Sequence, residues 1–129
     1  MPRYRGVWLA LGWGMALCIA FGSLWPSMPQ VATGISDKFL HFSAYAGLAF
    51  CFSGVVERHH WARVVVGLLL FGGAIELAQE FLSPTRTGEL GDLAANAAGI
   101  VAGILVAALF PQSWCRRVES LAGLHGEAR

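Results

Sequence analysis

The chain has 129 residues, of which 56% are hydrophobic, 16 are glycine and 13% are charged, with a formal net charge of +1. Soluble domains have about a quarter of their residues charged, so this composition excludes an ordinary soluble enzyme and a disordered chain. The near-neutral balance also excludes a nucleic-acid binder, which needs a basic surface, and three cysteines do not form a disulfide framework. We therefore expect a single membrane domain over residues 1–129.

Four apolar runs are long enough to cross a membrane, and they cover residues 7–25, 39–56, 62–82 and 93–110. Each has 18–21 residues and would be about 27–32 Å long as a helix, which matches the hydrocarbon core of a bilayer. Backbone polar groups have no water partner there, so the runs should be helical. The sequence therefore predicts an all-α, polytopic membrane protein, a bundle of four transmembrane helices.

The first run follows Arg3 and Arg5, as the apolar part of a signal peptide would. No small-x-small cleavage site follows it at a suitable distance, so we expect a retained membrane span. Seven of the nine Lys and Arg residues fall on one side of the predicted membrane, and only Lys38 and Arg86 fall on the other. The positive-inside rule then predicts that both termini are cytoplasmic.

Polar residues of the last three predicted helices reach one depth near the outer face. At 1.5 Å per residue, His41 lies about 6 Å deeper than Asp37, and Asn96 lies about 6 Å deeper than Asp92. Glu76 lies about 9 Å below the end of its helix. Ionisable groups inside a membrane are costly and mostly functional, so the coincidence predicts one shared site. Its expected ligand-binding residues are Asp37, Lys38, His41, Tyr45, Glu76, Gln79, Arg86, Asp92 and Asn96.

Three blocks of these residues carry a resemblance to a known family. They are Asp37-Lys38-x-x-His41-Phe42-x-x-Tyr45, then Glu76-x-x-Gln79 with Arg86 behind it, then Asp92-x-x-x-Asn96-x-x-Gly99. In this order and spacing, over about residues 35–105, the chain resembles the VanZ-like family of small bacterial membrane proteins. The resemblance implies a multi-span protein of the inner membrane that acts at the cell envelope. It also implies a link to teicoplanin resistance, the property of the founding member, but no particular reaction.

Individual residues of the site have structural explanations as well. Asp37 and Asp92 each stand at a helix start, where an acid caps free N–H groups and complements the helix dipole. Lys38 could extend to the lipid headgroups. Gln79 and Asn96 could form hydrogen bonds that link one helix to another. Glu76 and His41 are the candidate catalytic residues, because a buried carboxylate must be paired, protonated or bound to a metal. If a metal binds, its expected ligands are Asp37, His41, Glu76 and Asp92.

Three classes of function fit the site. In the first, an outer-leaflet polar pocket binds a lipid-linked or phosphate-bearing ligand, with Lys38 and Arg86 facing the phosphate. In the second, the chain is a membrane-embedded hydrolase or transferase of a lipid or lipid-linked cell-wall precursor, with His41 and Glu76 as acid and base or as metal ligands. The third, a proton relay for transport, is the weakest because no polar path continues inward. The expected partners are membrane lipids and such a precursor, without nucleic acid, and no cofactor is identified.

Small residues in the fourth run have a packing explanation. The pattern Gly99-x-x-x-Gly103 lets another helix approach closely. This face predicts tight packing within the bundle and also allows an oligomer to form through Gly99 and Gly103. The tail after Pro111 is too short and mixed to form a domain of its own.

Overall fold

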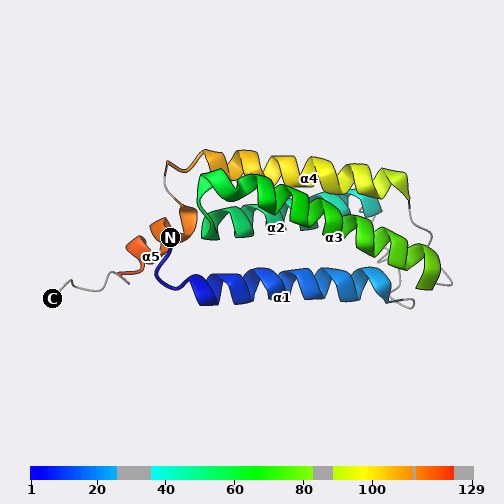
Figure 1. Cartoon of the computed structure of the whole chain (residues 1–129), viewed down its shortest axis with the longest axis horizontal. Coiled ribbons are helices and arrows are strands. Elements are labelled where there is room, and N and C mark those ends of the chain that lie inside the picture. Colours follow the sequence, from blue (N-terminus) through cyan, green and yellow to red (C-terminus); the bar gives the residue numbers. More distant parts are fainter. Residues whose placement is uncertain (26–35, 83–88, 112, 124–129) are drawn as a thin grey trace.

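The computed structural model describes residues 1–25, 36–82, 89–111 and 113–123. The long helices are α1 (Arg5–Leu24), α2 (Asp37–Val55), α3 (Trp61–Leu82) and α4 (Leu90–Ala108). A 3₁₀ turn, η1 (Arg58–His60), leads into α3, and a short helix, α5 (Trp114–Leu121), follows α4. The described parts of the chain contain no strand. The long helices lie along the length of the bundle and alternate in direction, and α5 lies at the end that also holds the N-terminus (Figure 1). The predicted all-α class is confirmed.

The predicted runs coincide with the four long helices to within about three residues at each end. Within the described ranges, three segments are long and apolar enough to cross a membrane, namely Arg5–Leu24, Arg58–Leu82 and Leu90–Ala108. Helix α2 has 19 residues but is not among them. The first two turns of α2 contain Asp37, Lys38 and His41, which make it less apolar than the others. The structure therefore supports a membrane protein with three apolar spans around a more polar helix.

Helix α2 is the inner helix of the bundle and contacts each of the other α-helices. Its side chains Tyr45, Leu48, Ala49 and Val55 are at most 1% exposed. The other long helices expose large apolar side chains along their outer faces, such as Leu17, Leu70 and Leu105, whereas α2 exposes such side chains near its start, at Phe39 and Leu40. Outward apolar faces around a buried inner helix are expected of a bundle whose surroundings are lipid.

Two glycines bring α2 and α4 into close contact. A Cβ atom at Gly99 would collide with the carbonyl group of Phe42, and one at Gly103 would lie 2.9 Å from the Cβ atom of Ala49. The predicted tight packing through this face is thus present within the chain. Helix α2 of the same chain therefore covers Gly99 and Gly103. The oligomer expected through these glycines stays a prediction.

Helix α5 was not predicted, and it ties the tail to the N-terminus. Glu119, which is 7% exposed, accepts hydrogen bonds from the backbone N–H groups of Arg3 (2.8 Å) and Tyr4 (2.9 Å) and from the indole of Trp8 (2.9 Å). Trp114 donates to the carbonyl of Phe50 at 2.8 Å. The short helix therefore owes its place to contacts with distant segments, which a local sequence pattern does not reveal.

Acid should weaken this contact. Burial raises the pKa of Glu119, but the N–H groups of Tyr4 and Arg3 and the indole of Trp8 outweigh burial and hold the pKa below its ordinary value. The stabilisation is therefore fully present above the unfolded-state pKa and is lost as pH falls through the folded-state pKa. We expect Glu119→Gln to lower the melting temperature at about pH 7 and to differ much less from the wild type at about pH 3.

The matched control is Glu57→Gln, which removes an exposed carboxylate at the same end of the bundle and should change the melting temperature little at either pH. If the difference in melting temperature between Glu119→Gln and the wild type were the same at both pH values, the stabilising role of the ionised Glu119 carboxylate would be contradicted.

Candidate functional site

The start of α2 places Asp37 and His41 on one helical face. Ser36 is the N-cap, and its hydroxyl oxygen accepts the N–H of Phe39 at 3.3 Å. Asp37 follows in the first turn, where its charge complements the helix dipole. Because residues four apart lie above one another on a helix, the Asp37 carboxylate stands next to the His41 ring. The local capping signal thus accounts for where the first acid of the site lies.

The start of α4 brings a second acid to the same place. Asp92 lies in the first turn of α4 and is 6% exposed, and Asn96, one turn further, is 1% exposed. Lys38 crosses from α2 and passes Gly91 so closely that a Cβ atom there would lie 2.7 Å from the lysine Cε. Its Nζ atom lies 3.1 Å from Glu89 Oε2 and 3.8 Å from Asp92 Oδ1. A side chain larger than glycine before Asp92 would therefore require the flexible end of Lys38 to shift.

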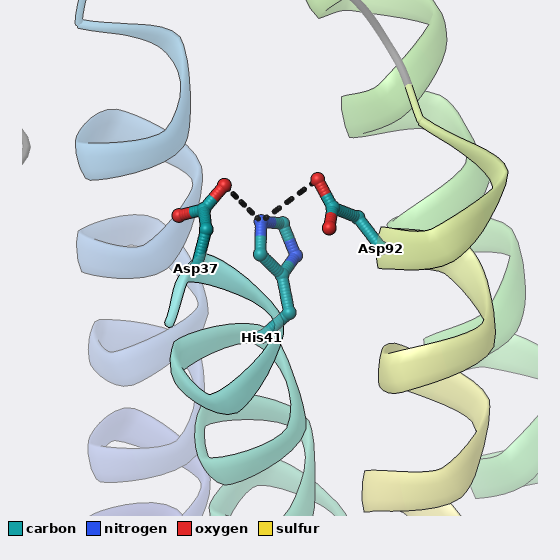
Figure 2. A group of neighbouring side chains, drawn as sticks. All are labelled: Asp37, His41 and Asp92. Atoms are coloured by element: carbon teal, nitrogen blue, oxygen red, sulfur yellow. Dashed lines mark ion pairs between the residues drawn. The ribbon is translucent and has the colours of Figure 1, made fainter. Parts of the chain in front are cut away.

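The His41 ring lies between the two aspartates (Figure 2). Its Nε2 atom is 3.9 Å from Asp37 Oδ2 and 3.8 Å from Asp92 Oδ2. Its Nδ1 atom is 3.0 Å from Asn96 Oδ1. An amide oxygen only accepts, so Nδ1 donates this hydrogen bond and carries a hydrogen atom. In the neutral ring the Nε2 lone pair therefore faces two carboxylates.

These three groups lie close enough together to be candidate ligands of one ion. Distances of 3.8–3.9 Å between Nε2 and the carboxylate oxygens are too long for hydrogen bonds. One ligand atom from each of Asp37, His41 and Asp92 lies within 4.8 Å of the others. Atoms bound at about 2.0–2.2 Å from a common ion lie roughly 3–4 Å from one another. The predicted metal ligands Asp37, His41 and Asp92 are therefore brought together.

Glu76 reaches the same end of the bundle from α3 but is not one of the three converging groups. Its side chain is 9% exposed, and its Oε2 atom accepts the backbone N–H of Glu89 at 3.0 Å. Glu76 Oε1, Asp92 Oδ1 and Tyr45 Oη are buried without a hydrogen-bond partner among the described residues. Buried polar atoms are normally bonded, so these three mark the site as unusual for a merely structural contact.

The structure separates one other predicted residue, Gln79, from this group. Gln79 donates its amide to the carbonyl of Ser23 in α1 at 2.9 Å, so it links α3 to α1. Arg86 lies outside the described residues, and its expected pairing with Glu76 stays a prediction. Glu89 was not predicted as a site residue. Its signal was its place three residues before Asp92, at the same helix start.

The charge of the described site is negative. Asp37, Glu76, Glu89 and Asp92 bring four carboxylates against one ammonium, that of Lys38. Adding a proton to His41 would still leave an excess of acid. A site of this composition attracts a cation more readily than an anion.

Comparison with known proteins agrees with the resemblance seen in the motifs. The zinc-regulated transporter 1 of Saccharomyces cerevisiae (strain ATCC 204508 / S288c) is 33% identical over 86 residues, which are 65% of this chain and 21% of that protein. The chain thus spans about a fifth of that relative's length. No solved structure matches. Residues 6–111 match the model of the VanZ/LLP1 family, and since this covers most of the chain, the protein belongs to the VanZ/LLP1 family.

Proposed function

We propose that the protein is an inner-membrane component of the bacterial envelope whose outer-leaflet site binds a divalent cation and, through it, the phosphate of a lipid-linked ligand. The observation that carries the proposal is the His41 ring, held by Asn96 so that Nε2 faces two carboxylates. A histidine ligand normally donates its other N–H to an outer acceptor, which sets its tautomer. Asn96 has that role here.

The donor set of one imidazole and two carboxylates suits Zn²⁺ or Mn²⁺. Three protein ligands leave at least one coordination position for another molecule, as in catalytic zinc sites. Similarity to a yeast zinc-regulated transporter supports Zn²⁺ as the first ion to test. We propose this metal-binding role for the site; we do not extend the transporter's activity to this chain.

Lys38 supports a phosphate as the further ligand. Its ammonium group stands 3.8 Å from Asp92 and its side chain is 57% exposed, so the ammonium group can turn from Glu89 toward an incoming anion. One phosphate oxygen would bind the cation and another would lie near the Lys38 ammonium group. These two positive charges would allow an anionic ligand to bind at an acidic site. Arg86 is a proposed further contact to the same phosphate.

Membrane placement of the site rests on α2 as the fourth span. Helix α2 has 19 residues, about 28 Å, and beyond its first turn it is mostly covered by the other helices, so it can be less apolar than they are. The lysine and arginine distribution supports cytoplasmic termini, which puts the starts of α2 and α4 at the outer face. An outer site in the inner membrane is where lipid-linked envelope precursors are exposed.

The binding step can be tested with a defined lipid. Purified protein in phosphatidylcholine vesicles containing a polyprenyl phosphate should bind that lipid in the presence of Zn²⁺. Chelation should weaken binding at least about tenfold, and Lys38→Gln should weaken it by about tenfold, because a charge-assisted contact is lost.

The matched control is Glu89→Gln, which breaks the ion pair of Lys38 but keeps the ammonium group, and should retain binding. Equal binding with and without the chelator, or by Lys38→Gln and the wild type, would contradict the proposed ligand.

A second candidate is hydrolysis of the same class of lipid, and the buried Glu76 favours it. A cation in the site would lower the pKa of a bound water, and the unpartnered Oε1 of Glu76 offers an acceptor for its proton. The oxygen of the water would bond to phosphorus as the P–O bond to the lipid breaks, and the proton held by Glu76 would pass to the departing alkoxide, which releases inorganic phosphate and the alcohol. Phosphate release in the vesicle experiment, abolished by Glu76→Gln with binding retained, would select this candidate over simple binding.

A further inference from the structure

A cavity lies at the opposite end of the bundle from the candidate metal site. It holds about 380 Å³ between the first half of α1 and the first half of α3, with Phe52 of α2 behind it. Figure 1 shows these two helix segments near the N-terminus and α5. Its apolar lining includes Trp13, Ala16, Leu68 and Phe71.

Two arginines and a histidine lie beside this apolar lining. Arg5 from α1, and His60 and Arg63 from the start of the α3 segment, all line the cavity. Both arginines are exposed, and neither side chain forms an ion pair or hydrogen bond with another described residue. The one acid in the lining, Glu57, lies 3.4 Å from His59 Nδ1. Two guanidinium groups therefore face the cavity without a carboxylate of their own.

We infer that this cavity binds an anionic phospholipid, with its phosphate at Arg5 and Arg63 and an acyl chain along the apolar lining. Guanidinium groups bind phosphate oxygens with two parallel hydrogen bonds, so a pair of them is well suited to a phosphodiester. From Arg5 to Ala16 the lining follows about 16 Å of helix, which suits a hydrocarbon chain and not a small free anion. Both helices are candidate membrane spans, so lipid is their neighbour. This inference is independent of the proposed metal site.

The headgroup contact can be tested by native mass spectrometry of the full chain. The protein, released from detergent micelles containing equal amounts of phosphatidylglycerol and phosphatidylcholine, should retain phosphatidylglycerol preferentially. Arg5→Gln and Arg63→Gln should each reduce this retention by about fivefold, and the double variant by about 25-fold. Arg117→Gln, an exposed arginine of α5 outside the cavity, is the matched control and should behave as the wild type. Equal retention of the two lipids by the wild type would overturn the inference, as would a double variant that matches Arg117→Gln.

The acyl-chain contact needs a variant that fills the cavity without disturbing the fold. Gly67 lines the cavity, and a Cβ atom there would have no neighbour within 4 Å. Gly67→Leu should therefore fold normally and reduce lipid retention by about tenfold. Gly73→Leu is the matched control, because it also points into open space on α3 but does not line the cavity. Identical retention by the two leucine variants would overturn the lipid assignment. So would displacement of the lipid by inorganic phosphate at equal concentration, which would reveal a site for any phosphate anion.

Discussion

Asparagine in place of Asp92 should weaken Zn²⁺ binding to the purified protein by more than about 100-fold, as measured by competition with a chelating dye. The change keeps the size of the side chain and removes the charge and one strong oxygen ligand. Asp92 is buried beside His41, so the lost ligand oxygen lies within the proposed metal site. The bundle should remain folded, since an amide is less costly to bury than an unpaired carboxylate.

Two histidines of this chain, His41 and His59, offer a matched comparison. His41→Asn removes the proposed nitrogen ligand and should lose Zn²⁺ to a similar degree. His59→Asn removes a histidine that stands in an exposed contact with Glu57, and should bind as the wild type does. Asn96→Leu removes only the acceptor that orients His41, so we expect a loss of about 10–100-fold. Equal Zn²⁺ affinity in the His41 and His59 variants would contradict the proposal that His41 is a zinc ligand.

Leucine in place of Gly99 should unfold or greatly destabilise the bundle, by more than about 3 kcal/mol. The new side chain would meet the backbone of α2 at Phe42 and Ala46, where no rotamer change can make room. Helix α2 would have to move away from α4, and the shift would also separate His41 from Asp92. The measurement is the melting temperature in detergent, read by loss of helical circular dichroism.

Gly14→Leu is the control for this prediction, because a Cβ atom at Gly14 has no neighbour within 4 Å. It makes the same chemical change on another candidate membrane span and should leave the melting temperature nearly unchanged. A Gly99→Leu protein that melts like Gly14→Leu would show that the close approach of α2 and α4 is not needed for folding.

Much of the fold could be predicted from the sequence, because length and apolarity alone locate membrane helices. The four runs matched the long helices, and the small residues of α4 pointed to close packing. Helix α5 could not be predicted, since its position depends on Glu119 meeting the backbone of Arg3 and Tyr4 across the whole chain. Local patterns carry no information on such distant contacts.

The site was predictable to the extent that depth in the membrane follows from residue number. The depth argument placed Asp37, His41 and Asp92 at one end of the bundle, and the structure brings these three side chains close together there. Depth does not say which way a side chain faces around its helix, so Gln79, at the right end of α3, instead contacts α1 through Ser23. The pairing of Lys38 with Glu89 was missed because it requires the helix starts to be adjacent in three dimensions.

Anomalous X-ray diffraction at the zinc edge, from crystals of the protein grown with Zn²⁺, would locate any metal ion held by His41 and the two aspartates. We expect one strong peak about 2.0–2.2 Å from His41 Nε2 and from a carboxylate oxygen of each of Asp37 and Asp92, with His41 Nδ1 still bonded to Asn96. Crystals that show zinc only at other residues, with His41 Nε2 hydrogen-bonded directly to a carboxylate, would contradict the proposed metal site.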